Sequence, residues 1–234
     1  PSLVDNASDL ERLYTELNRE RDLPKLKTPL PVVDNLASHL RENDWETQVS
    51  LSAVNGQYEI TELNGPDDDQ PDYGIAVDIG TTTVVLELVN LKTGKSIATS
   101  GLYNKQARYG DDVIGRINYV KQNDGGLERL HQAVINTINE LIDNVVDKQS
   151  IEYDDIKTAV FAGNTTMSHL FLGIDPDNIR LEPYIPTVNF IPPLQAKELD
   201  INIKEEGWIH YIPGVSSFVG GDITSGALAT EISE

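Results

Sequence analysis

The stretch YGIAVDIGTTTVVLELVNL, residues 73–91, predicts two β-strands joined by a tight turn. Apolar residues alternate with small or polar ones before the turn, and residues 83–91 are again rich in β-branched and apolar side chains. The turn itself, DIGTTT at residues 78–83, combines an acid, a glycine and threonines. Glycine has no Cβ, so the backbone can turn sharply there or a ligand can approach it closely.

These turn residues carry the groups that a metal-bound phosphate needs. Asp78 ends a predicted buried strand, where its charge costs desolvation energy unless something compensates it. Its carboxylate can serve the cation, and Gly80, Thr81, Thr82 and Thr83 can offer amides and hydroxyls to phosphate oxygens. The sequence therefore predicts a phosphate-binding turn with a metal at Asp78. A hairpin with a polar turn and no ligand is the structural alternative.

Composition narrows the function classes. The chain has 234 residues, enough for one large or two small domains, and its 38 acidic and 18 basic residues give a formal net charge of -20. Such a surface repels nucleic acids and anionic membranes, so we expect neither as a partner. The absence of cysteine excludes disulfides and thiolate-bound metal clusters within this chain. No segment resembles a membrane span or a signal peptide, and we expect a cytoplasmic protein.

Residues 1–65 are expected to form a small α+β module that packs or docks without chemistry of its own. Its predicted elements are helices over residues 7–21 and 31–41, an extended connector over residues 22–31, and a hairpin of residues 45–51 and 57–63 that turns at Asn55-Gly56. Residues 66–72, rich in proline and acids, are predicted to be a solvated linker.

The pattern changes at residue 73, where longer apolar segments begin. Strands are predicted over residues 73–79, 83–91, 96–103, 156–163 and 208–212. One helix is predicted to begin near Asp111, with Ile114 on its buried face. Three further helices are predicted over residues 127–146, 164–172 and 222–233. Residues 173–197 are proline-rich and are expected to be irregular.

Two further helix starts supply candidate binding residues. Asn164 and Thr165 follow the glycine that ends strand 156–163, and their side chains either face a cleft or merely cap the helix. Asp222 begins the last predicted helix, either as an N-cap or as an acid that faces the same cleft. The sequence leaves both alternatives open for each position.

The order of elements after residue 73 resembles the ribonuclease H-like half of the sugar kinase, heat-shock chaperone and actin superfamily. The predicted fold class is therefore α/β, with a mixed sheet of three antiparallel strands plus parallel strands with helices, preceded by the small α+β domain. The resemblance implies ATP and Mg as cofactors and catalytic roles for Asp78 and Asp222, which it places across a cleft. It also implies that Asn164 and Thr165 join the turn residues in binding the cofactor.

Four segments are more specific: GIAVDIGTTTVV, YGDDVIGRI, VFAGNTTMSHL and FVGGDITSGALA. Together they resemble the ATP-dependent reductive activators of corrinoid proteins. That resemblance implies a linker and middle domain in residues 1–65 and the first subdomain of an actin-like ATPase domain in residues 73–234. The family's [2Fe-2S] domain and the second half of its ATPase domain have no counterpart in the sequence. We therefore expect the chain to be an internal fragment.

The family's reaction is the reduction of inactive Co(II) corrinoid to Co(I), coupled to ATP, with an electron from the iron–sulfur domain. The resemblance implies a corrinoid iron–sulfur protein as the partner and allows a homodimer. The fragment alone is expected to lack full ATPase activity. Two alternatives remain: a small-molecule kinase of the same superfamily with Asp222 as base, and a non-enzymatic docking scaffold.

Overall fold

The computed structural model describes residues 5–21, 23, 25–54 and 56–230. The chain divides into two compact units, Pro1–Gln70 and Pro71–Glu234, each described here by itself. Within the described residues, no helix combines the length and the apolar character that crossing a membrane requires.

The N-terminal unit has a three-stranded sheet with the order β1-β3-β2 and two helices. The elements are α1 (Asp9–Arg21), β1 (Leu26–Lys27), α2 (Leu30–Glu42), β2 (Gln48–Val54) and β3 (Gln57–Asn64). β2 and β3 form the predicted antiparallel hairpin, although Asn55 of its predicted turn lies outside the described residues. Leu13, Leu36, Leu40 and Ile60 form the buried core between helices and sheet.

Two predictions for this unit were wrong in detail. The expected connector over residues 22–31 contains β1, which pairs in parallel with β3. The first hairpin strand begins at Gln48 rather than at residue 45, because Asp44 and Trp45 have left-handed backbones that turn the chain after α2.

The C-terminal unit is built on a six-stranded sheet with the order β6-β5-β4-β7-β9-β8. Its strands are β4 (Tyr73–Ile79), β5 (Thr83–Asn90), β6 (Lys95–Tyr103), β7 (Ile156–Gly163), β8 (Leu194–Gln195) and β9 (Trp208–Tyr211). β6, β5 and β4 are antiparallel neighbours, whereas β7 and β9 continue the sheet in parallel with β4. Three antiparallel strands followed by parallel ones confirm the predicted ribonuclease H-like mixed sheet.

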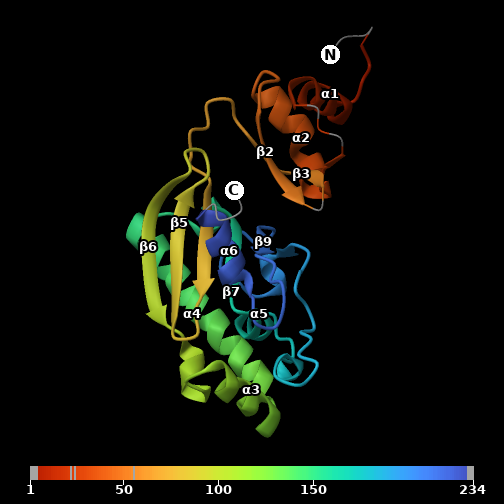
Figure 1. Cartoon of the computed structure of the whole chain (residues 1–234). Coiled ribbons are helices and arrows are strands. Elements are labelled where there is room, and N and C mark those ends of the chain that lie inside the picture. The colour runs from red at the N-terminus through yellow and green to blue at the C-terminus, as the bar shows by residue number, and fades with distance from the viewer. Residues whose placement is uncertain (1–4, 22, 24, 55, 231–234) are drawn as a thin grey trace. The chain divides into compact units, whose positions relative to one another are not determined.

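Helices cover both faces of this sheet. The helices of this unit are α3 (Val113–Gln122), α4 (Gly126–Gln149), α5 (Thr165–Phe171) and α6 (Gly221–Ala229), with 3-10 turns η1 (Lys105–Tyr109), η2 (Tyr153–Asp155), η3 (Asp177–Ile179) and η4 (Ala196–Glu198). In Figure 1, α4 (green) runs behind the strands and α6 (blue) lies in front of them. The apolar stripe of α4 packs under the sheet with Ile75, Val77 and Ile79 of β4, as its helical spacing predicted. Alternation along β4 then places Asp78 on the opposite face.

Three boundaries or faces differ from prediction. Asp112 caps α3 by accepting a hydrogen bond from the Gly115 amide, so the helix begins at Val113 rather than at Asp111. Ile114 is exposed, and Arg116 takes its place on the buried face. The last helix is described to Ala229 and capped at Thr230, and the predicted continuation to residue 233 falls outside the described residues. The expected irregular segment at 173–197 contains β8, η3 and part of η4.

Candidate functional site

The predicted phosphate turn and the start of α5 meet at one edge of the sheet. β4 pairs with β7 in parallel, with Asp78 opposite Ala162 and Ile79 opposite Gly163. The chain leaves both strands at the same level, so Gly80 and Asn164 are neighbours at their carboxyl ends. This edge is the usual place for a ligand in a sheet with parallel strands, because loops and helix starts converge there.

Gly80, Thr81 and Thr82 connect β4 to β5, and we call them the Gly80–Thr82 turn. A Cβ added to Gly80 would lie 2.4 Å from the carbonyl oxygen of Thr83. Every other residue type would force this turn open, because real Cβ atoms do not approach an oxygen so closely. The close fold-back explains why a glycine follows Asp78.

Asp78 lies on the open face of the sheet beside the turn, and its side chain is exposed. Partial burial by the surrounding protein, together with the negative charge of Asp222, raises the pKa of Asp78 above its ordinary value. Two carboxylates that repel one another in this way favour a cation between or beside them.

No group of three or more acidic or histidine side chains that could hold a metal occurs in the described part of the chain. Mg²⁺ does not need such a group, since it commonly binds through one or two carboxylates, several waters and substrate phosphates. The donor set at this edge, with Asp78 and Asp222 beside the turn, therefore fits a hydrated magnesium ion that accompanies a phosphate chain.

The carbonyl oxygens of the Gly80–Thr82 turn are all held from the interior. Asn104 donates from its side-chain amide to the Gly80 oxygen at 3.0 Å and from its backbone amide to the Thr82 oxygen at 2.9 Å. Arg116 donates from Nη2 to the Thr81 oxygen at 2.5 Å. Asn104 is 1% exposed and Arg116 is 0% exposed, so both donors lie beneath the turn.

The amides of the same turn are left for a ligand. Among the described residues, none accepts a hydrogen bond from the amide of Thr81 or Thr82. The side chains of Thr82 and Thr83 are exposed, and Thr81 is half-buried. Carbonyls directed inward and amides and hydroxyls directed outward make a surface that suits an anion.

Asn164 is the N-cap of α5, one of the two roles that its sequence context allowed, and it also contacts the Gly80–Thr82 turn. Its Oδ1 caps α5 by accepting a hydrogen bond from the Met167 amide at 3.0 Å, and its Nδ2 donates to the Thr81 hydroxyl at 3.1 Å. Thr165 is only 5% exposed, and its hydroxyl donates to the Ser216 carbonyl at 2.8 Å. Thr165 thus fastens the loop before α6 to α5, which is a structural role.

α6 begins close to these residues. A Cβ added to Gly220 would lie 2.6 Å from the Asn164 Cα, so the chain before α6 packs directly on the start of α5. Asp222 follows in the first turn of α6, and its Oδ1 accepts a hydrogen bond from the Ile223 amide at 2.8 Å. The half-buried Asp222 is near enough to affect the titration of Asp78, although the two lie on different elements.

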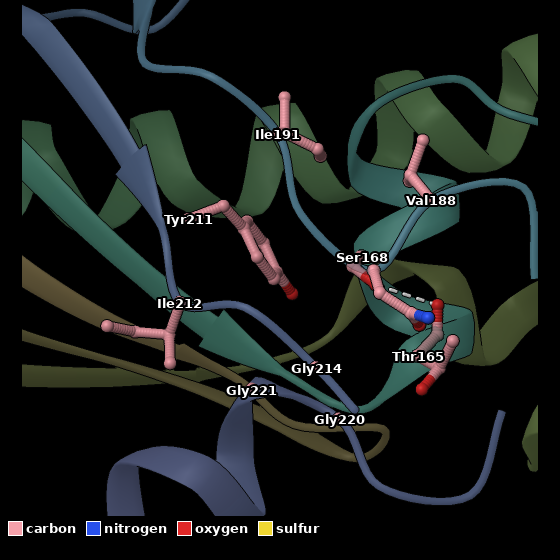
Figure 2. Close-up of a pocket in the computed structure, with 10 residues that line it drawn as sticks. Thr165, Ser168, Val188, Ile191, Tyr211, Ile212, Gly214, Gly220 and Gly221 are labelled. Carbon is pink, nitrogen blue, oxygen red and sulfur yellow. Dashed lines mark hydrogen bonds between the residues drawn. The ribbon is translucent and has the colours of Figure 1, made fainter. Parts of the chain in front are cut away.

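A small pocket lies behind this edge, between β9, α5 and the loop at residues 188–191. Figure 2 shows Tyr211 pointing into it from β9, with Thr165 and Ser168 of α5 on the other side. Its volume of about 10 Å³ is that of roughly one water molecule, which excludes a nucleotide. Burial, with added effects of Asp222 and Asp78, raises the pKa of Tyr211. Because this pocket is too small for a nucleotide, the Gly80–Thr82 turn at the carboxyl ends of β4 and β7 is the better candidate for a nucleotide site.

Three buried polar residues at this edge were missed by the sequence analysis: Asn104, Gln106 and Arg116. Gln106 connects them further, accepting from Arg116 Nη1 at 3.0 Å and donating to the Leu130 carbonyl at 2.9 Å. A signal did exist, since Arg116 lies at helical spacing among Val113, Ile117 and Val120, where an apolar side chain would be expected.

Comparison with known proteins identifies the family. A family model described as the RACo middle region matches residues 73–234, and one described as the RACo linker region matches residues 1–70. The chain belongs to the RACo family. The family models give the name linker region to residues 1–70 and middle region to residues 73–234, whereas the resemblance in the sequence had implied both a linker and a middle domain within residues 1–65.

Two relatives of this RACo chain carry informative names. The corrinoid activation enzyme RamQ of Eubacterium limosum is 34% identical over 172 residues, which cover 74% of this chain and 29% of RamQ. A solved structure of a reductive activator for corrinoid, iron-sulfur protein is 45% identical with a TM-score of 0.92, and the match covers 98% of this chain and 36% of that one. The RACo chain thus spans about a third of the length of these relatives.

Proposed function

We propose that this chain provides one wall of the nucleotide site in an ATP-dependent activator of a corrinoid protein. The observation that carries the proposal is the Gly80–Thr82 turn, whose carbonyls are held inward and whose amides face outward beside Asp78 and Asp222. The names of the relatives support corrinoid activation as the purpose of that nucleotide.

In the proposed reaction, one electron converts the inactive Co(II) corrinoid of the partner protein to Co(I). Hydrolysis of ATP to ADP and phosphate makes this uphill reduction favourable. An iron–sulfur centre would supply the electron, and it must be bound elsewhere in the full-length protein because this chain has no cysteine. Asp78 would hold the magnesium ion, and the turn amides with Thr82 and Thr83 would hold phosphate oxygens.

Asp222, in the first turn of α6, would orient the attacking water or accept a proton from that water. Asn164 would act through Thr81, whose hydroxyl it holds, and so keep the turn in register with α5. Because these groups all belong to one wall, we propose that this chain alone does not turn over ATP at the rate of the full-length protein. Nucleotide contacts from other parts of the longer protein would complete the site.

The test is ATP-dependent reduction of a corrinoid protein, followed through the cobalt absorption spectrum, with the full-length protein and its variants. Asp78→Ala and Asp222→Ala should each reduce the rate by at least about 100-fold, the scale of a lost catalytic acid, base or metal ligand. Asp147→Ala removes an exposed carboxylate from α4 and serves as the matched control. Parent-like rates in both site variants, or a parent that needs no ATP, would exclude the proposal.

A further inference from the structure

Arg116 is a buried cation that lies behind the proposed nucleotide site. It projects from the first turns of α3, and its side chain is 0% exposed. Its Nε donates to the Gly110 carbonyl at 3.0 Å, its Nη1 to Gln106 at 3.0 Å, and its Nη2 to the Thr81 carbonyl at 2.5 Å. The Met167 sulfur completes the set at 3.1 Å from Nη1.

All of these acceptors are neutral. No ion pair to Arg116 occurs within the described residues, and Asp111 and Asp112 act on it only through space. Desolvation is the main effect and lowers the pKa of Arg116 to about 10, so the guanidinium still keeps its charge at neutral pH. A buried charge without a paired carboxylate is costly, because neutral groups repay only part of the lost hydration.

The position of this charge indicates which group could offset the desolvation free energy of the guanidinium. One guanidinium nitrogen lies directly behind the Thr81 peptide group, on the inner side of the Gly80–Thr82 turn. The Thr81 and Thr82 amides of the same turn have no acceptor among the described residues. In a planar trans peptide each amide points away from the preceding carbonyl, so both amides point away from Asn104 and Arg116. A negative group placed beside these amides would meet both the amide dipoles and the field of a cation that little water screens.

We infer that Arg116 is a positioning residue for the phosphate chain of the nucleotide. It holds the Thr81 carbonyl inward, so that the turn keeps its amides outward, and its charge favours an anion on the outer face. This inference rests on the proposed nucleotide site and deepens it. Arg116 touches neither phosphate nor magnesium itself, which separates its role from that of Asp78.

The structure provides matched variants. Arg116→Met removes the charge and the donors but keeps an unbranched apolar side chain that reaches about as far as the arginine Nε. Arg116→Lys keeps the charge, yet its single ammonium cannot serve Gly110, Gln106 and Thr81 together. Arg108→Met is the control, because Arg108 lies in the 3-10 turn η1 before α3, is exposed, and stacks on the ring of Tyr109.

The first measurement compares binding of Mg-ATP and of adenosine to the full-length protein by calorimetry. Arg116→Met should weaken Mg-ATP binding at least about tenfold, the effect of losing one oriented charge and its hydrogen bonds, and change adenosine binding less than about twofold. Arg116→Lys should fall between the parent and the Met variant, and Arg108→Met should match the parent. A general structural defect would weaken the binding of Mg-ATP and of adenosine by similar factors. Equal losses for both, or none in a folded Arg116→Met, would overturn the inference.

The second measurement needs no nucleotide and so separates the inference from the proposed function. Hydrogen exchange of the peptide that covers residues 79–86 should speed up at least about tenfold in Arg116→Lys and Arg116→Met, while the core of α4 still exchanges more slowly than this peptide. If the parent fails to bind Mg-ATP, the proposed function fails, and unchanged exchange at the turn would refute the positioning role in its own right. Should Arg116→Met not fold, Arg116→Lys decides both measurements.

Discussion

Arg19 of the N-terminal unit and Arg116 of the C-terminal unit lie in opposite settings. Arg19 lies at the surface and pairs with Glu16 at 2.6 Å, with 72% and 56% of the two side chains exposed. In the C-terminal unit, Arg116 is fully buried and bound to carbonyls, an amide and a sulfur. A surface pair neutralises its own field, whereas the charge of Arg116 remains available to whatever lies across the turn. The difference supports the anion site that we propose at the Gly80–Thr82 turn of the C-terminal unit.

The largest expected difference between the units is in stability. Arg116→Met should lower the unfolding free energy of the C-terminal unit by about 3 kcal/mol, because buried carbonyls lose their donors. Arg19→Met should cost the N-terminal unit less than about 1 kcal/mol, the usual value of an exposed pair. Hydrogen exchange in increasing urea measures the unfolding free energy of each unit separately. Equal costs in the two units would remove the contrast on which this comparison depends.

A smaller effect is expected at the two hairpin glycines. Gly80→Asn should destabilise the C-terminal unit by about 2 kcal/mol, since its Cβ would meet the Thr83 oxygen at 2.4 Å. Gly56→Asn should cost less than about 1 kcal/mol, because Gly56 has φ +72 with open space around it, and asparagine tolerates that conformation. Thermal unfolding of both variants provides the measurement. A tolerated Gly80→Asn would mean that the turn has room to relax.

The smallest effect concerns the pH dependence of the stability of the C-terminal unit. The pKa of Asp78 is raised in the folded state, so its ionisation costs stability as the pH rises from the unfolded pKa through the folded one. Asp78→Asn should therefore raise the thermal midpoint at pH 7 and leave it unchanged at pH 3, where the parent carboxyl is already protonated. Asp147→Asn, on α4, serves as the control. A lower midpoint at pH 7 would contradict the repulsion between Asp78 and Asp222.

The strands on either side of the Gly80–Thr82 turn and the buried face of the long amphipathic helix were predictable because they depend on local periodicity. β4 and β7 have the bounds that their apolar runs predicted, and Leu130, Val134, Ile138, Leu141, Ile142 and Val145 of α4 are all buried as the 3.6-residue repeat requires. β1 was missed because two residues, Leu26 and Lys27, carry no periodicity and pair only through the tertiary fold.

The candidate site was predictable only in part, for a different reason. Asp78, Gly80 and the threonines stand together in the sequence, so their chemistry can be read locally. The side chains that orient this turn come from residues 104, 116 and 164, and only folding brings them beneath it. An arginine on an apolar helix face is a signal of such a partner, but the sequence alone does not tell which carbonyl it will meet.

The tight contact at Gly220 has a mechanical consequence. With a distance of only 2.6 Å between the position of a Gly220 Cβ and the Asn164 Cα, the start of α6 has no room to slide against the start of α5. The Asn164–Thr81 hydrogen bond extends the same rigidity to the Gly80–Thr82 turn. If the protein closes around a nucleotide, the start of α5, the start of α6 and the Gly80–Thr82 turn would move together as one rigid body. The hinge would then lie outside these three segments.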